Sequence, residues 1–168
     1  MMKRSRRIGS LFIGLLLASI IPGLAAEMVE LQLSGKAIRA YRMADLEQAQ
    51  KQAREAKLPI AWIASSPTVL ENNGKIALSN GRGATLHAFY AFSDKAVLVF
   101  QDAYAENHQG PAIVDHALHT PDPHYTPPTV VILDPELKQV LATIPYEPDF
   151  NRRTQVFQET LAHLGGPP

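Results

Sequence analysis

The stretch TPPTVVILDP, from Thr126 to Pro135, places two adjacent prolines directly before a run of β-branched and aliphatic residues. Proline has no backbone N–H and a fixed φ, so it occurs at or before the first residue of a strand and not inside the hydrogen-bonded ladder. The stretch therefore predicts a strand from Thr129 to Asp134 that is entered through a stiff segment and ended by Pro135.

Further strands are predicted on both sides of this one. Upstream, PIAWIA (residues 59–64) and AVLVFQD (residues 96–102) are apolar runs of strand length. The first has no polar interruption, which suits a central strand buried on both faces, with Trp62 in the core. Downstream, QVLATI (residues 139–144) lies close enough to form an antiparallel hairpin with Thr129 to Asp134.

Helices are predicted between these strands. The clearest runs from Asp45 to Lys57, where Leu, Ala and charged residues recur with helical spacing and Pro59 follows. Others are expected at residues 84–92, in a short segment opened by Pro111, and at residues 151–164, while Asn80-Gly81-Arg82-Gly83 is typical of a turn. The order predicts an α/β fold, a central mixed sheet of about four strands with helices on both faces.

The first 26 residues have the three-part layout of a secretory signal peptide. Four basic residues lie among residues 3–7, an apolar run spans residues 11–21, and small residues precede a cut after Ala26. We therefore expect a periplasmic or secreted protein whose mature part, residues 27–168, is one domain. The alternative is an uncleaved signal that anchors the chain to the membrane.

Composition excludes some functions. The signal segment holds four of the 16 basic residues and none of the 16 acidic ones, so the mature chain would carry a charge of about −4. A nucleic-acid partner is not expected, because phosphate binding needs a basic surface. The chain has no cysteine, although exported proteins meet conditions in which disulfides form. Its stability must come from packing.

Taken together, the helix that ends in Lys57-Leu58-Pro59, the strands PIAWIA and AVLVFQD, and Pro-Thr-Val-Val-Ile-Leu-Asp with its hairpin and closing helix resemble the thioredoxin family. The resemblance covers most of residues 45–164 and implies a thioredoxin-like fold. It also implies that Pro128, followed by Thr129, is the counterpart of the family's cis-proline, which packs against the redox loop.

Three departures from the family change the expected function. The two redox cysteines would fall at Pro67 and Leu70, or at Ser66 and Val69, and a hydroxyl cannot replace a thiolate in disulfide exchange. The buried acid of many relatives would fall near Ala61. The residue before the cis-proline, which binds substrate backbone in relatives, is Pro127 and has no N–H to donate.

We therefore expect a thioredoxin-like protein without thiol–disulfide activity, a non-catalytic binding or accessory module of the cell envelope with a protein or peptide partner. The expected binding surface comprises two loops: Ser65, Ser66, Pro67 and Thr68 in one, and Thr126, Pro127 and Pro128 in the other.

Two alternatives remain open. His116, His119 and His124 could bind Zn or Cu, since imidazole is a good ligand for both, although their spacing matches no standard site; otherwise no cofactor is expected. A hydrolase would need Ser65, Ser66 or Thr68 next to a histidine, and the chain has no Gly-x-Ser-x-Gly motif.

Overall fold

A computed structural model describes residues 28–33, 35–66, 80–105, 110–120 and 126–164. The expected signal peptide, residues 1–26, lies outside this part. The described residues form one six-stranded sheet in the order β1-β2-β4-β3-β5-β6. Its strands are β1 (Met28–Leu33), β2 (Lys36–Arg42), β3 (Ile60–Ser65), β4 (Val97–Asp102), β5 (Thr129–Leu133) and β6 (Val140–Ile144).

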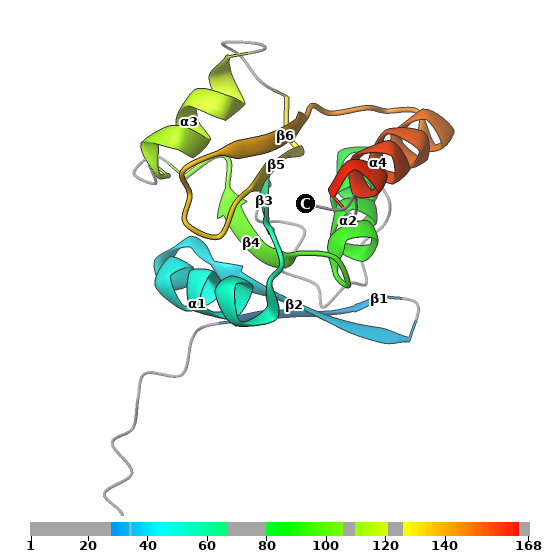
Figure 1. Ribbon diagram of the computed structural model, residues 1–168. Helices are drawn as coiled ribbons and strands as arrows, with labels where there is room; N and C mark the ends of the chain where they lie inside the picture. Colours follow the sequence, from blue (N-terminus) through cyan, green and yellow to red (C-terminus); the bar gives the residue numbers. More distant parts are fainter. Residues whose placement is uncertain (1–27, 34, 67–79, 106–109, 121–125, 165–168) are drawn as a thin grey trace, which may run out of the picture.

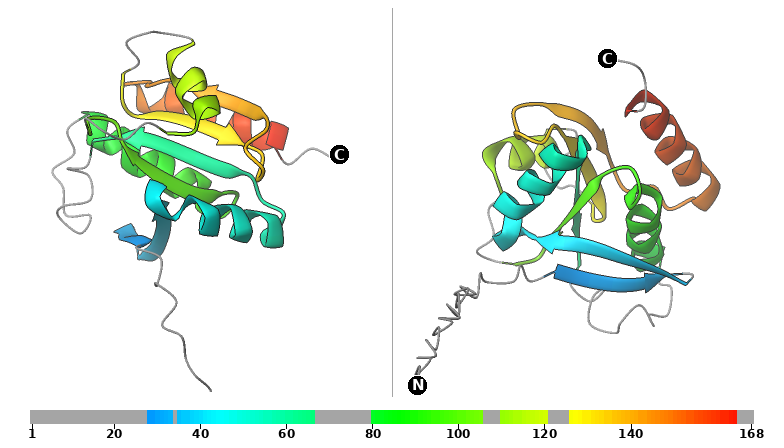
Figure 2. Two further views of the ribbon diagram at one scale, coloured as in Figure 1. Left: turned by 90° about the vertical axis from the view of Figure 1, so that its left-hand side faces the viewer. Right: turned by 60° about the horizontal axis from the view of Figure 1, so that its bottom comes forward.

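The predicted mixed sheet is confirmed, with two more strands than expected. The pairs β2–β4 and β3–β4 are parallel, whereas β3–β5, β5–β6 and β1–β2 are antiparallel. The count of about four strands was too low because the hairpin of β1 and β2 was missed (Figure 2). Its register pairs Leu33 with Lys36, and Gly35 between them has a φ of 80°, a conformation that favours glycine.

Helices cover both faces of the sheet, as predicted. They are α1 (Leu46–Ala56), α2 (Asn80–Phe92), α3 (Ala112–His119) and α4 (Phe150–Leu164), and a short 3-10 helix η1 (Met43–Asp45) precedes α1. Figure 1 shows α1 and α3 on one side of the sheet and α2 and α4 on the other.

Each face has its own apolar core. Phe89 and Phe92 of α2 and Phe157 of α4 pack with Ala61 and Ile63 of β3. On the other face, residues of α1 and α3 pack with the remaining apolar residues of the same strand, a cluster that includes Ala49, Ala53, Val114, Leu118, Ile60, Trp62 and Ala64. β3 is buried along its whole length, which confirms the prediction of a central strand.

Both ends of α1 and the start of α2 differ from the predictions. Asp45 belongs to η1 and its side chain does not cap α1, while Lys57 ends α1 in a left-handed conformation with its N–H bonded to the carbonyls of Ala53 and Arg54. The turn expected at Asn80-Gly81-Arg82-Gly83 was wrong, because α2 begins at Asn80. A glycine inside a helix costs only about 1 kcal/mol, which the buried residues from Ala84 to Phe92 offset.

Trp62 is a core residue, as predicted. Its side chain is fully buried, and its indole N–H donates to Oε1 of Gln101 at 2.7 Å. None of the helices in the described ranges is long and apolar enough to cross a membrane.

Candidate functional site

The two loops of the expected binding surface lie at the same end of the sheet. β3 and β5 are antiparallel, and Ala64 is opposite Thr129, so Ser65 and Pro128 each lie one residue further toward that end. The Pro127–Pro128 bond is cis, as the resemblance implied. Pro128 is buried, Ser66 and Pro127 are half-buried, and Thr126 is exposed. Pro67 and Thr68 lie outside the described residues.

Side-chain hydroxyls hold both loop ends in place. Ser65 is 2% exposed, and its Oγ lies 2.7 Å from Oγ1 of the buried Thr85 on α2. The hydroxyl of Thr129 donates to the carbonyl of Thr126 at 3.2 Å and so bridges the two prolines. The hydrogen-bond partner of the Ser65 hydroxyl in the described part of the chain is Thr85 and not a histidine. The Ser65 hydroxyl thus links the end of β3 to α2 and helps to position this surface.

A buried arginine lies on the α2–α4 side of Pro128. Arg153 of α4 is 7% exposed and lines a small pocket together with Pro128 and Tyr146. Its Nε donates to Nδ1 of His87 at 3.1 Å, and its Nη1 donates to the carbonyls of Glu147 and Pro148 at 2.6 and 3.3 Å. Through these hydrogen bonds, Arg153 links Glu147 and Pro148, which lie between β6 and α4, to His87 of α2.

His87 is half-buried beside Arg153. Its ring stacks on Phe150 with 4.8 Å between centroids and makes a T-shaped contact with Phe157 with 5.0 Å between centroids. Burial, and secondly the positive charge of Arg153, lower the pKa of His87 below its usual value of 6.5. Because Arg153 donates to Nδ1, the imidazole is neutral and carries its proton on Nε2.

The sequence analysis did not find His87 and Arg153. Arginine is seldom buried, and the spacing of apolar residues in α4 gives no sign that one of its two adjacent arginines turns inward. The other, Arg152, is 75% exposed and pairs with the Glu147 carboxylate at 3.2 Å.

We predict that stability falls as the pH is lowered because of His87. A histidine with a lowered pKa in the folded state stabilises the fold when neutral, so this contribution is complete above pH 6.5 and is lost as the pH drops through the folded pKa. Urea unfolding of the wild type and of His87→Gln between about pH 7.5 and pH 5 measures this contribution to stability. Glutamine can still accept from Arg153 but does not titrate, so His87→Gln should show a smaller loss.

The matched control is His163→Gln, which removes an exposed histidine of α4. This variant should keep the pH dependence of the wild type. If the free energy of unfolding changed with pH by the same amount in the wild type and in His87→Gln, the loss of stability at low pH would have another origin.

The predicted metal ligands are only partly visible. His116 and His119 are exposed on α3, and Nδ1 of His119 lies 2.8 Å from the carbonyl oxygen of Asp115. His124 lies outside the described residues. Within the described ranges, no group of three His, Cys, Asp or Glu side chains could hold a metal ion. The three-histidine site stays a prediction.

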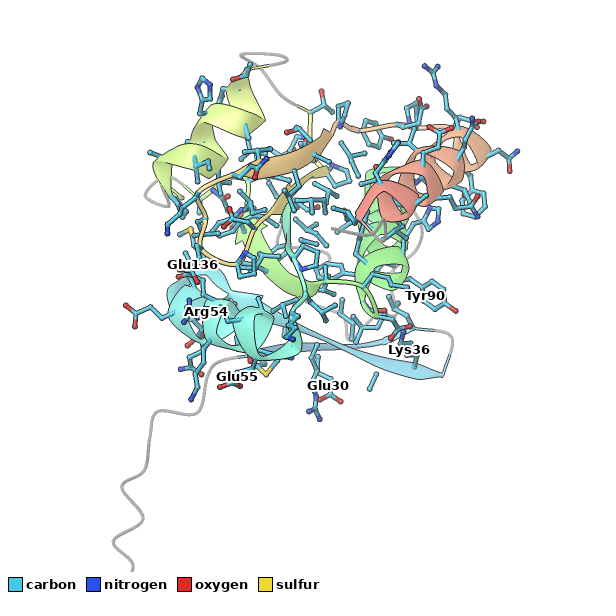
Figure 3. All side chains as sticks on the ribbon, in the orientation of Figure 1. Glu30, Lys36, Arg54, Glu55, Tyr90 and Glu136 are labelled. Carbon is cyan, nitrogen blue, oxygen red and sulfur yellow. The ribbon has the colours of Figure 1, made fainter. Side chains whose placement is uncertain are left out.

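A larger groove, of about 500 Å³, lies where β2 separates from β4. The ladder between these strands contains only Tyr41–Val99 and Arg42–Phe100, so the first half of β2 is not paired with β4. Lys36 lines the groove, pairs with Asp94, and lies 5.8 Å from the ring centre of Tyr90 (Figure 3). Charges of both signs on this groove select no particular ligand.

Comparison with protein-family models and with curated proteins found no family and no curated protein that matches this chain.

Proposed function

We propose that this protein is an exported thioredoxin-like protein that does not catalyse thiol–disulfide exchange and acts as a non-catalytic binding or accessory module of the cell envelope. The observation that carries the proposal is that the end of β3 and the head of β5 lie side by side, with Pro128 next to Ser65. In the family that the sequence resembles, the redox loop and the cis-proline have this relation.

The order of the strands supports the thioredoxin-like part of the proposal. The parallel strands β3 and β4 lie at the centre, β5 and β6 continue the sheet in antiparallel pairs, and helices cover both faces. The hairpin partner β1 extends the sheet beyond β2.

The chemistry of this end of the sheet supports binding over catalysis. The whole chain lacks cysteine, so it has no thiolate to attack a disulfide. The Ser65 hydroxyl is bonded to Thr85, and Pro127 has no N–H for a partner's backbone. A protein or peptide partner would therefore depend on side-chain contacts with Ser66, Thr126 and the prolines.

Two measurements test the proposal. The purified protein should not accelerate the reduction of insulin disulfides by dithiothreitol. A photo-crosslinking amino acid at Ser66 or Thr126 should capture the same envelope protein in cells. The control position is Glu55, which is exposed near the end of α1, at the opposite end of the sheet from Ser65. Faster insulin reduction, or identical products from Ser66 and Glu55, would contradict the proposal.

A further inference from the structure

Arg153 carries a buried positive charge that no carboxylate of the described residues neutralises. Its hydrogen bonds go to an imidazole nitrogen and to two backbone carbonyls, all uncharged. The two acidic residues that precede it, Glu147 and Asp149, contact Arg152 instead. The Glu147 carboxylate pairs with the Arg152 side chain, and Oδ1 of Asp149 accepts from the Arg152 backbone N–H. A buried charge is costly unless it is paired, so an interaction with an anionic group would be favourable here.

One edge of the guanidinium is left for a ligand. An arginine has five N–H donors, of which Nε uses one and Nη1 two. Within the described part of the chain, Nη2 has no hydrogen-bond partner, and no buried side-chain nitrogen there is without one. Nη2 is therefore in reach of solvent, and Arg153 is one of the residues that line the pocket beside Pro128.

The walls of this pocket define what can enter. They are formed by Ala84, Ala88, Pro128, Val130, Ile144, Pro145, Tyr146, Glu147 and Phe157 besides Arg153. The free volume, about 10 Å³ for the centre of a water-sized sphere, is close to the room for one water. A whole small molecule does not fit, whereas one oxygen at the tip of a longer group does.

We propose that Nη2 of Arg153 binds a carboxylate oxygen of the protein or peptide partner, from an acidic side chain or a C-terminus, in the pocket beside Pro128. Charge-assisted bonds from arginine to carboxylate are about twice as strong as neutral ones. The inference rests on the proposed function for the presence of a partner at this surface, and it adds the chemical group that the partner presents.

Short probes test the site without the partner. N-acetylglycine supplies a terminal carboxylate, N-acetylaspartate N-methylamide a side-chain carboxylate, and N-acetylglycinamide is the uncharged control. Each is titrated into the ¹⁵N-labelled protein while the Nε–H signal of Arg153 is followed by NMR. We expect saturable shifts with a Kd of about 1–10 mM for at least one carboxylate and none for the amide. The probe that binds more tightly shows whether the partner's carboxylate comes from a C-terminus or from an acidic side chain.

Two variants locate the binding. Arg153→Lys keeps a charge but loses the planar fork, and should weaken binding about tenfold, measured on backbone signals around Pro128. The control is Lys51→Gln, which removes an exposed positive charge on α1 and should leave the Kd unchanged. If Arg153→Lys does not fold, Tyr146→Glu leaves Arg153 intact and adds a carboxylate at the pocket, so it should weaken the probe about fivefold relative to Tyr146→Gln.

Equal shifts from carboxylate and amide, or no saturation with any probe, would overturn the carboxylate site. Crosslinking at Ser66 and Thr126 would then still decide the proposed function on its own. Carboxylate binding together with no site-dependent crosslink would instead overturn the proposed function and keep the subsite.

Discussion

Replacing Trp62 with alanine is expected to lower the free energy of unfolding by about 3–5 kcal/mol, which is the usual cost of deleting a buried large aromatic side chain. Trp62 is fully buried on β3, and the layer between the sheet and α1 and α3 packs around it. The substitution also removes the hydrogen bond from the indole to the buried Gln101.

Urea unfolding followed by far-ultraviolet circular dichroism measures this loss, because Trp62 is the only tryptophan and its fluorescence disappears in the variant. Tyr104→Ala removes an aromatic side chain that is 66% exposed and should change stability by less than about 0.5 kcal/mol. Similar small losses for both variants would show that Trp62 is not in the core.

Leu31→Ala is expected to cost about 2–5 kcal/mol. Leu31 lies in β1, one of the two edge strands, and is 1% exposed in the core beneath α2 and α4. The residue before it, Glu30, is 51% exposed on the opposite face and pairs with Arg39 at 3.4 Å. Urea unfolding of Glu30→Ala should show a loss below about 1 kcal/mol, as is typical of surface ion pairs.

The comparison of these two neighbours tests whether β1 belongs to the folded domain. If Leu31→Ala unfolds at the same urea concentration as Glu30→Ala, then β1 does not pack against the core in solution.

Three of the four predicted strands differ in burial from the two strands that were missed. β3, β4 and β5 are buried on both faces and read as continuous apolar runs, so they were found. In β1 and β2, Val29, Leu31, Ile38 and Ala40 are buried while Glu30 and Arg39 are exposed. In the sequence, such a half-buried hairpin shows apolar and polar residues alternating on both sides of a turn glycine. A search for continuous apolar runs overlooks this pattern.

The candidate site could be predicted only where a local sequence motif points to it. The Pro-Pro-Thr sequence before an apolar run marked the head of β5, and the resemblance placed it beside the end of β3. The contact between His87 and Arg153 joins residues 66 positions apart in sequence. Both residue types are ordinary on helix surfaces, so only the packing of α2 against α4 shows that they meet.

β3 contributes to both interior layers, because successive side chains of a strand point to opposite sides. Ile60, Trp62 and Ala64 contact one pair of helices, and Ala61 and Ile63 contact the other. A force applied at the Ser65 end of this strand is therefore shared between the two halves of the domain. If a ligand reduced the motion of that end, we would expect slower hydrogen exchange in all four helices. β3 would then couple the two helical layers mechanically.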